Sequence, residues 1–434
     1  MSEVIGGVSN MQALEALESN VRLYSRSFPT FFSRARGSIM LTEDGRTVID
    51  FLSGAGALNY GHNNHQIKAA ITDYLASDAV VHGLDVATPA KLEFMETFSS
   101  VILQKRGLSY RFQFTGPTGA NAIEAALKLS RKITGRENII SFTRGYHGLS
   151  LGAVAATGNR FYREASGVSL PGVTFMPYDG YLGQSVDTAD YIRKILLDKS
   201  SGIDLPAAVL VETIQGEGGI NVARNEWLQS IQDIAKDLGA VFIVDDVQMG
   251  CGRTGEFFSF EFAGLSPDVV VLSKSLSGYG LPLSVLLIKE EVDAWQPGEH
   301  TGTFRGNNLA LVSATAALNL YWRDQTFSQG VQRTGEFMHR RLEAISLKCR
   351  NRFAVRGRGM AFGFDCQMAE IAGETARTAF EKGLIIERCG PLNRVVKFLP
   401  ALTIDFETLS HGLDIFEESL AETLKQIGPV ELQD

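Results

Sequence analysis

The chain has 434 residues, of which 44% are hydrophobic and 21% are charged, and its formal net charge is −8. This balance is typical of a globular protein with ample material for a large buried core, so we expect one large domain and a smaller companion. Acidic and basic residues are interspersed, which gives no reason to expect nucleic acid as a partner. No apolar run approaches the roughly 20 residues that a membrane span needs, and the first residues lack the features of a signal peptide.

The cysteines and histidines predict no metal site. No C-x-x-C pair occurs, so neither a disulfide framework nor a zinc site is indicated. His62 and His65, in GHNNH, have no metal-ligand pattern around them and are interpreted as capping or packing residues. We therefore expect a reduced, cytoplasmic enzyme without a metal. The four cysteines are Cys251, Cys349, Cys366 and Cys389.

The N-terminal part predicts a helix followed by a hairpin. Ser9-Asn10 followed by MQALEALESNVRLYSRSF predicts one capped amphipathic helix that ends before Pro29. The stretch GSIMLTEDGRTVIDFLSG contains two alternating runs around Glu43-Asp44-Gly45, the pattern of a β-hairpin.

From about residue 65, helical segments alternate with short apolar runs. The runs at 207–212, 241–245 and 269–273 are almost continuously apolar, which is typical of strands buried on both faces of a parallel sheet. Between the first two lies EWLQSIQDIAKDLG, a helix expected to stop at Gly239. This βαβ succession predicts an α/β fold with right-handed crossovers.

A long Ala-rich helix is expected from roughly residue 310, followed by mixed helix and strand signals. We assign residues 65–310 to a large domain and residues 311–434 to a C-terminal small domain. Residues 1–64 form an N-terminal segment that joins the small domain.

Polar residues follow three of the predicted buried strands. Glu212, Asp245 and Lys274 lie where each strand ends, and open α/β sheets bind their ligands at such ends. Taken alone, each signal is weak. A lysine after a strand is usually a solvated loop residue, an acid can be a helix cap or a Mg²⁺ ligand, and a Gly-rich run usually marks a turn.

Six motifs taken together are specific. They occur in order and resemble the class III aminotransferases along nearly the whole chain. That resemblance implies the type I aminotransferase fold, with a mostly parallel central sheet flanked by helices and a small α/β domain. It also implies pyridoxal 5′-phosphate (PLP) as the cofactor. The motifs are FTGPTGANAIEAALKLSRK, GYHGLSLG, VETIQGEGG, VDDVQMGCGRTG, LSKSLSGYGLPL and TGTFRGNN.

The resemblance implies a role for each matching residue. Lys274 is expected to bind the cofactor covalently and then to shuttle a proton during catalysis. Asp245 matches the carboxylate that keeps the pyridine nitrogen protonated, and Gln248 matches the residue that hydrogen-bonds the phenolic oxygen. Val247 and Tyr146 match the two residues that sandwich the ring.

The phosphate group is expected at a helix N-terminus. Thr118-Gly119-Ala120 precede the helix AIEAALKLSRK, whose N–H groups and dipole suit an anion. Thr303 matches a phosphate-binding threonine that family members donate from the neighbouring subunit. Shared active sites would make the enzyme a homodimer or a tetramer.

Some residues near these motifs have more than one possible role. Glu212 is a weaker cofactor-binding candidate, because both it and Gln215 could be sheet-end hydrogen-bonding groups. His147 is expected to be structural rather than a general base. The role of Asp246 is open, since family members more often carry Glu there.

Two departures from common family members concern the substrate carboxylate. Leu149 and Lys397 stand where many members carry a carboxylate-binding arginine, and lysine lacks the bidentate fork of arginine. The stretches YSRSFP, GAGALNYGHN, WQPGEHTGTFRGNN and KFLPALT resemble the branch of L-2,4-diaminobutyrate:2-oxoglutarate 4-aminotransferases, the ectoine-pathway type above all. The branch implies an amino donor and a keto acid as substrates, exchanged in a reversible ping-pong reaction.

Glu217, in GEGG, is expected to take part in catalysis by switching the substrate pocket. Relatives use a glutamate there to mask a cationic anchor when the substrate other than glutamate binds. Lys397 is the candidate anchor, and Arg305 is a second candidate cation.

Other functions of the same fold stay open at this point. Another ω-amino acid or diamine aminotransferase, an aminomutase, a racemase or a decarboxylase would share Lys274 and Asp245. A PLP-binding regulator without activity is a remote alternative, because no helix-turn-helix region is left over. A nicotinamide dehydrogenase is excluded, since no G-x-G-x-x-G follows an early strand.

Overall fold

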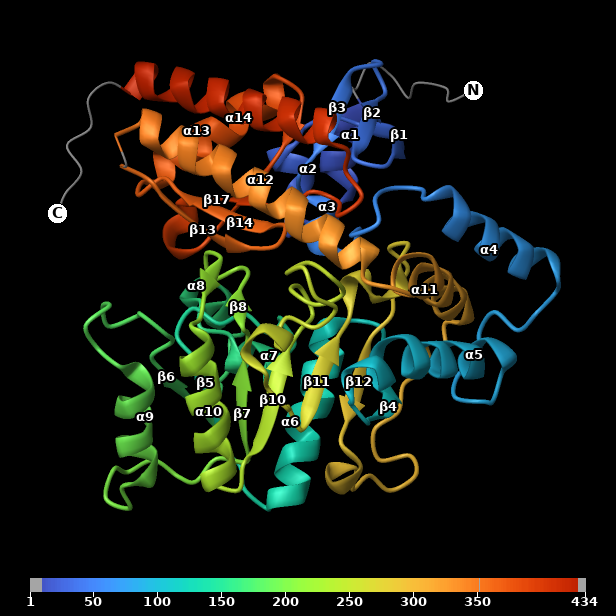
Figure 1. Ribbon diagram of the computed structural model, residues 1–434, viewed down its shortest axis with the longest axis vertical. Coiled ribbons are helices and arrows are strands. Elements are labelled where there is room, and N and C mark those ends of the chain that lie inside the picture. Colours follow the sequence, from blue (N-terminus) through green and yellow to red (C-terminus); the bar gives the residue numbers. More distant parts are fainter. Residues whose placement is uncertain (1–9, 351, 428–434) are drawn as a thin grey trace.

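The computed structural model describes residues 10–350 and 352–427, which form two bodies stacked one above the other (Figure 1). The large body is built on a seven-stranded sheet with helices on both faces. The small body contains two four-stranded sheets and the C-terminal helices. No helix among the described residues is both long and apolar enough to cross a membrane.

The central sheet has the strand order β4-β12-β11-β10-β7-β5-β6. Within it, β12 runs antiparallel to both of its neighbours, and the other pairs are parallel. The predicted mostly parallel sheet is therefore confirmed. The strands are β4 (Arg111–Phe114), β5 (Ile139–Phe142), β6 (Val173–Met176), β7 (Ala208–Val211), β10 (Val241–Asp245), β11 (Val269–Leu272) and β12 (Val285–Ile288).

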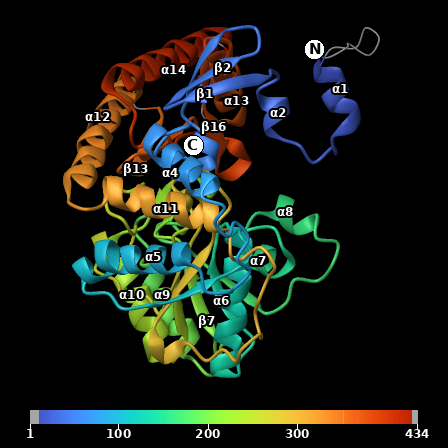
Figure 2. The same cartoon turned by 90° about the vertical axis from the view of Figure 1, so that its right-hand side faces the viewer.

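Both faces of this sheet are buried, which explains the apolar runs in the sequence. In β10, Phe242 and Val244 pack into one hydrophobic cluster, whereas Val241 and Ile243 pack into another. Successive side chains of a strand point to opposite faces, so each face needs its own apolar set. Figure 2 shows α6 on one side of β7 and helices α9 and α10 on the other.

The helices around the sheet begin and end as their sequences predict. In α6, Thr118 caps the N-terminus by accepting a hydrogen bond from Asn121 N, and Gly135 ends the helix with φ +67°. Gly239, at φ +60°, follows α10 in the same way. The helices are α4 (His65–Ala76), α5 (Pro89–Phe98), α6 (Gly119–Thr134), α7 (Leu151–Ala156), α8 (Arg160–Glu164), α9 (Thr188–Leu197), α10 (Asn225–Asp237) and α11 (Asn308–Tyr321).

The small body packs three helices against the sheet β13-β14-β17-β16. Its core is rich in phenylalanine, and Phe364 and Phe398 both contact Phe416 of α14. Its elements are α12 (Thr326–Lys348), β13 (Ala354–Arg358), β14 (Ala361–Asp365), α13 (Ala369–Glu381), β16 (Glu387–Cys389), β17 (Val395–Phe398) and α14 (Phe406–Ile427).

A second sheet of the small body joins N-terminal strands to a strand from the C-terminal part of the chain. Its order is β1-β2-β3-β15, and β15 (Leu384–Ile385) pairs in parallel with β3 (Thr47–Asp50). The strands β1 (Phe32–Arg36) and β2 (Ile39–Thr42) complete it, and the predicted hairpin is the β2–β3 pair. The N-terminal strands thus lie against C-terminal residues, while the division of the chain at residues 64/65 and 310/311 stays a proposal.

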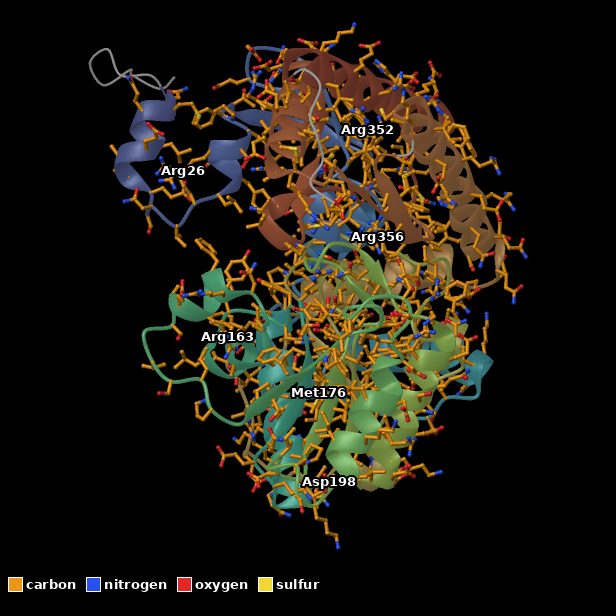
Figure 3. All side chains as sticks on the ribbon, turned by 90° about the vertical axis from the view of Figure 1, so that its left-hand side faces the viewer. Arg26, Arg163, Met176, Asp198, Arg352 and Arg356 are labelled. Carbon is orange, nitrogen blue, oxygen red and sulfur yellow. The ribbon has the colours of Figure 1, made fainter. Side chains whose placement is uncertain are left out.

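The single N-terminal helix predicted from Ser9 to Phe28 is wrong. Two short helices, α1 (Asn10–Leu17) and α2 (Tyr24–Ser27), replace it, and Ser9 lies outside the described residues. In the intervening turn, Asn20 accepts two hydrogen bonds from the Arg26 guanidinium, which lies between the helices in Figure 3. Helix α1 buries none of its residues, so no tertiary packing favours a longer helix over this turn.

One buried arginine ties the two bodies together. The Arg253 side chain is fully buried and donates to the carbonyl oxygens of Met360 (3.0 Å) and Pro400 (2.6 Å) and to Asn59 Oδ1 (2.6 Å). These acceptors come from segments distant in sequence. The guanidinium therefore fixes the loop after β10 against the small body.

Candidate active site

The loops after β7, β10 and β11 meet at one edge of the central sheet, facing the small body (Figure 1). Because β7, β10 and β11 are parallel neighbours, their carboxyl ends lie together. The loop after β7 reaches the small body directly, since Gly390 N donates to Glu217 O. The three strand-end residues Glu212, Asp245 and Lys274 are thereby brought to one place, as the sequence predicts.

Lys274 begins the 3-10 turn Lys274–Ser277 just after β11 and has φ +45°. A positive φ is uncommon for a lysine, and such conformations persist where neighbours hold them. Ser275 Oγ supplies part of that support by donating to Gly56 O. Burial lowers the pKa of Lys274, and the charge of Lys397 lowers it further, against the opposing charges of nearby carboxylates. A lowered pKa increases the neutral, nucleophilic fraction of the amine.

Asp245, the last residue of β10, is paired with a buried histidine. Its Oδ2 lies 2.7 Å from His147 Nδ1, and its Oδ1 accepts a hydrogen bond from Val247 N. Burial alone lowers the pKa of His147, but the hydrogen bond and charge of Asp245, with the charge of Glu212, outweigh burial and raise it. His147 thus orients the carboxylate of Asp245, in keeping with the expected structural role.

Glu212 holds two loops of the site. Its Oε2 accepts from Tyr146 N at 3.0 Å, and its Oε1 accepts from Gly216 N at 3.3 Å. Burial, together with the charge of Asp245, raises the pKa of Glu212 to about 7. Both oxygens are engaged by backbone groups, which favours the interpretation as a sheet-end hydrogen-bonding residue. Contact of Glu212 with a cofactor stays a prediction.

The N-terminus of α6 lies against the loop after β10. A Cβ atom placed on Gly119 would come within 3.0 Å of Val247 Cγ1. Behind it, a Cβ on Gly148 would lie 2.7 Å from Ala120 Cβ. The glycines therefore let three loops approach closely around the first turn of α6, where free backbone N–H groups suit an anion.

A buried ion-pair network lies on the small-body side of this edge. Lys397 of β17 is fully buried, and its Nζ lies 2.5 Å from Glu217 Oε1 and 2.9 Å from Glu387 Oε2. Gln248 Nε2 donates to the same Glu217 oxygen at 3.0 Å and to Ala55 O. Burial opposes ionisation of Glu217, but the charges of Lys397 and Lys274 lower its pKa to about 2. Glu217 and Lys397 are thus in direct contact, as the sequence suggests for an acid that masks a cation.

Three tyrosines surround this network. Tyr24 Oη donates to Glu387 Oε1 at 2.5 Å, and the rings of Tyr146 and Tyr162 meet edge to face, with centroids 5.6 Å apart. The pKa of Tyr146 is raised to about 12, mainly by burial and further by the charges of Tyr162 and Glu217. These aromatic side chains therefore place neutral phenols beside the network.

Thr303 and Arg305 lie outside this cluster. Thr303 is exposed on the loop before α11, where a contact from a second subunit would be accessible. Arg305 pairs with Asp85, so its positive charge already has a partner. This pairing disfavours Arg305 as an anchor for a substrate carboxylate.

Several other singled-out residues have structural contacts. His62 Nε2 lies 2.8 Å from Asp50 Oδ2, and His65 is exposed as the first residue of α4, which Asn64 caps. Asp246 accepts hydrogen bonds from Ser259 N, and burial raises its pKa to about 7. Among the described residues no cluster of His, Cys, Asp and Glu could hold a metal ion.

Comparison with known proteins identifies the family. Residues 22–420 match the model of the class III aminotransferases. The chain belongs to the class III aminotransferases. A protein of Sinorhizobium fredii named "Uncharacterized aminotransferase y4qG" is 59% identical, with 96% of this chain and 93% of the relative covered. A Halomonas elongata protein named diaminobutyrate–2-oxoglutarate transaminase is 53% identical, with coverage of 94% and 98%.

Solved structures confirm the fold. Toxoplasma gondii ornithine aminotransferase has a TM-score of 0.82 at 24% identity, with 97% of each chain covered. A Bacillus anthracis aminotransferase has a TM-score of 0.84 at 22% identity, with 96% of this chain and all of the other covered. The predicted aminotransferase fold is therefore confirmed, and membership of the class III family confirms the assignment as an enzyme.

PLP is the cofactor of this family and therefore of this chain. The residues at the sheet edge fit it. Gln248 Oε1 is buried without a hydrogen-bond partner in the described chain. Helix α6 begins at Gly119 beside Val247, and the first N–H groups of a helix have no partner within it, so they can bind a phosphate. When bound, the ring of PLP accepts electrons from the substrate carbon that loses its proton.

Sequence reasoning missed three residues of the site. Glu387, Tyr24 and Tyr162 belong to no motif that carried an assignment, although Tyr24 lies in the stretch YSRSFP. Glu387 is in a three-residue strand, and its position depends on pairing with β17. The sequence offers no periodic or spacing signal for such a pairing.

The Asp245–His147 pair predicts a pH-dependent contribution to stability. The pKa of His147 is raised in the folded state, so the stabilisation is complete below the unfolded value of about 6.5 and is lost as pH rises through the folded value. We expect the melting-temperature difference between wild type and His147→Gln, both cofactor-free and at equal concentration, to be larger at pH 6 than at pH 9. A difference that does not change with pH would contradict a charged pair.

Proposed function

We propose that this enzyme transfers the amino group between L-2,4-diaminobutyrate and 2-oxoglutarate, giving L-aspartate-4-semialdehyde and glutamate. The observation that carries the proposal is the set of relatives that bear this activity in their names. They include proteins of Bordetella parapertussis, Halomonas elongata and Streptomyces coelicolor, at 54%, 53% and 50% identity over at least 94% of this chain. The ectoine pathway is the predicted setting.

The geometry supports a substrate more complex than a simple ω-amino acid. The side chain in the place of one carboxylate-binding arginine, Leu149, is apolar and half exposed. The other such position is Lys397, which is already paired with two carboxylates. Of these two described positions, neither therefore offers an unpaired cation to a substrate whose distal end is only a carboxylate.

We assign the proton transfer to Lys274. Its amine lies at the strand-end edge with Asp245, and its lowered pKa suits an amine that both accepts and returns a proton at Nζ. Asp245, held by His147, is the group that keeps the proton on the ring nitrogen of the cofactor. Gln248, Val247 and Tyr146 are assigned to the ring, and Thr118, Gly119 and Ala120 to the phosphate.

Glu217 is assigned to the exchange between the two substrates. In the structure it neutralises Lys397, the state suited to the diaminobutyrate half-reaction. Glutamate brings a second carboxylate, which would displace Glu217 and pair with Lys397. The switch needs no new cation, because Lys397 serves both states.

We expect Glu217→Ala to affect the two half-reactions unequally. Without Glu217, Lys397 keeps only Glu387 as a carboxylate partner and can attract a substrate carboxylate in both half-reactions. We therefore expect kcat/KM for diaminobutyrate to fall about tenfold or more while the glutamate half-reaction is retained. Single-turnover absorbance changes with each amine measure the two reactions separately. Unchanged kinetics of both half-reactions would contradict the switch.

The alternatives are separated by one spectroscopic experiment. Diaminobutyrate, ornithine, 4-aminobutyrate and glutamate are added in turn to the purified enzyme. We expect diaminobutyrate and glutamate to bleach the visible band of the lysine-bound cofactor, and 2-oxoglutarate to restore it. Bleaching by another amine instead would retain the family and exclude this substrate. An aminomutase or racemase would turn over without any keto acid, and a regulator would not turn over.

We further propose that the active sites are shared between subunits of a homodimer or tetramer, with Thr303 donated across the interface. The exposed position of Thr303 supports this proposal, as do exposed apolar side chains nearby. Phe304 and Leu84 are among them. A cytoplasmic location is also proposed, in keeping with four free cysteines.

Mixed oligomers test the shared site. We expect co-assembly of Lys274→Ala with Thr303→Ala subunits to restore activity, because one site then combines an intact lysine with an intact threonine from the partner. Each variant alone should be impaired, Thr303→Ala by about tenfold or more. If the hybrids are no more active than the two parents, Thr303 serves its own chain or no site.

A further inference from the structure

The sheet β13-β14-β17-β16 of the small body presents a row of charged side chains to the active site. In the antiparallel register, Glu387 of β16 is directly opposite Lys397 of β17, which is opposite Gly363 of β14, which is opposite Arg356 of β13. Directly paired residues project from the same face of a sheet. Arg356, at the junction of the bodies in Figure 3, binds Gly219 O through Nε, so the loop after β7 lies over this row.

The row carries one more carboxylate than its buried lysine neutralises. Lys397 lies between Glu217 and Glu387, and its pKa is raised well above the usual value because the charges of both carboxylates outweigh the effect of burial. One ammonium and two carboxylates leave one surplus negative charge within these ion pairs, since Arg356 of the same row is paired with Asp365 and the amine of Lys274 is assigned to the cofactor. Buried charges are costly unless they are paired, so a surplus carboxylate at this position calls for a cation.

Glu387 has an oxygen available for such a cation. Its Oε1 accepts from Tyr24 Oη at 2.5 Å, which fixes the carboxylate. Its Oε2 lies within ion-pair distance of Lys397 but is buried without a hydrogen-bond donor in the described chain. Glu387 is not a remote charge, since its field acts on Lys274, Tyr146 and Tyr162, which line the site.

This inference rests on the proposed function and specifies how its substrate is chosen. L-2,4-Diaminobutyrate and 4-aminobutyrate carry the same reacting γ-amine and the same carboxylate, and they differ by the α-ammonium. While Glu217 is paired with Lys397, Glu387 is the carboxylate that can bind this α-ammonium. 4-Aminobutyrate has no α-ammonium, so the surplus negative charge would repel its carboxylate. We propose that Glu387, oriented by Tyr24, binds the α-ammonium of a diamino acid and selects it over the corresponding ω-amino acid.

The test compares the two amines in wild type and in Glu387→Gln. Glutamine keeps the shape of the side chain and an acceptor for Tyr24 but removes the charge. We expect the ratio of kcat/KM for diaminobutyrate to kcat/KM for 4-aminobutyrate to fall about 10- to 150-fold. The glutamate half-reaction and the visible cofactor band should be retained, because Lys397 and Glu217 stay in place. Glu370→Gln, at an exposed carboxylate of the same body, is the control and should leave the ratio unchanged.

A second variant covers the case in which Glu387→Gln does not fold. Tyr24→Phe removes the hydroxyl at a partly exposed position, and we expect it to lower the same ratio by a smaller factor. An unchanged ratio in a folded, active variant overturns the inference while leaving the function intact. If wild type uses ornithine rather than diaminobutyrate, the proposed function fails, and the ratio of ornithine to 5-aminopentanoate tests Glu387 in the same way.

Discussion

The structure depends on a buried ammonium shared by two carboxylates at the junction of its two bodies. Lys397 belongs to the small-body sheet, whereas Glu217 belongs to the loop that follows β7 of the large body. This contact brings the loop after β7 against the small body, where Gly390 also binds the loop backbone. Without its carboxylate partners, a lysine in this environment would lose its charge or move out to solvent. The packing of the two bodies therefore depends on these ion pairs.

The two bodies contribute different parts of the chemistry. The central sheet supplies the reacting groups at its strand ends, where Lys274 and Asp245 are fixed by short loops and by the His147 contact. The small body supplies the charged row that we propose to bind the far end of the substrate. Arg253 links the two bodies, because its single buried guanidinium makes hydrogen bonds to Met360, Pro400 and Asn59. In the proposed mechanism, reaction type is thus set by the large body and substrate choice by the small body.

The sequence predicted those parts of the site that depend on local pattern. Apolar runs located β7, β10 and β11, and the residues that end these strands were therefore correctly expected to lie together. It could not predict contacts that depend on sheet register or on distant pairing. Glu387 enters the site because β16 pairs with β17, and Tyr24 meets Glu387 across 363 residues of sequence. The N-terminal helix was overpredicted because its apolar spacing resembled a packed helix, although no core lies beside it.

In the proposed reaction, the γ-amine of diaminobutyrate reacts while its α-ammonium is only bound. The most direct measurement follows nitrogen-15 from diaminobutyrate labelled at one amine into glutamate formed from 2-oxoglutarate, by mass spectrometry. Because the γ-amine is transferred, we expect labelled glutamate from the γ-labelled substrate and unlabelled glutamate from the α-labelled one. Labelled glutamate from the α-labelled substrate, or no glutamate at all, would contradict it.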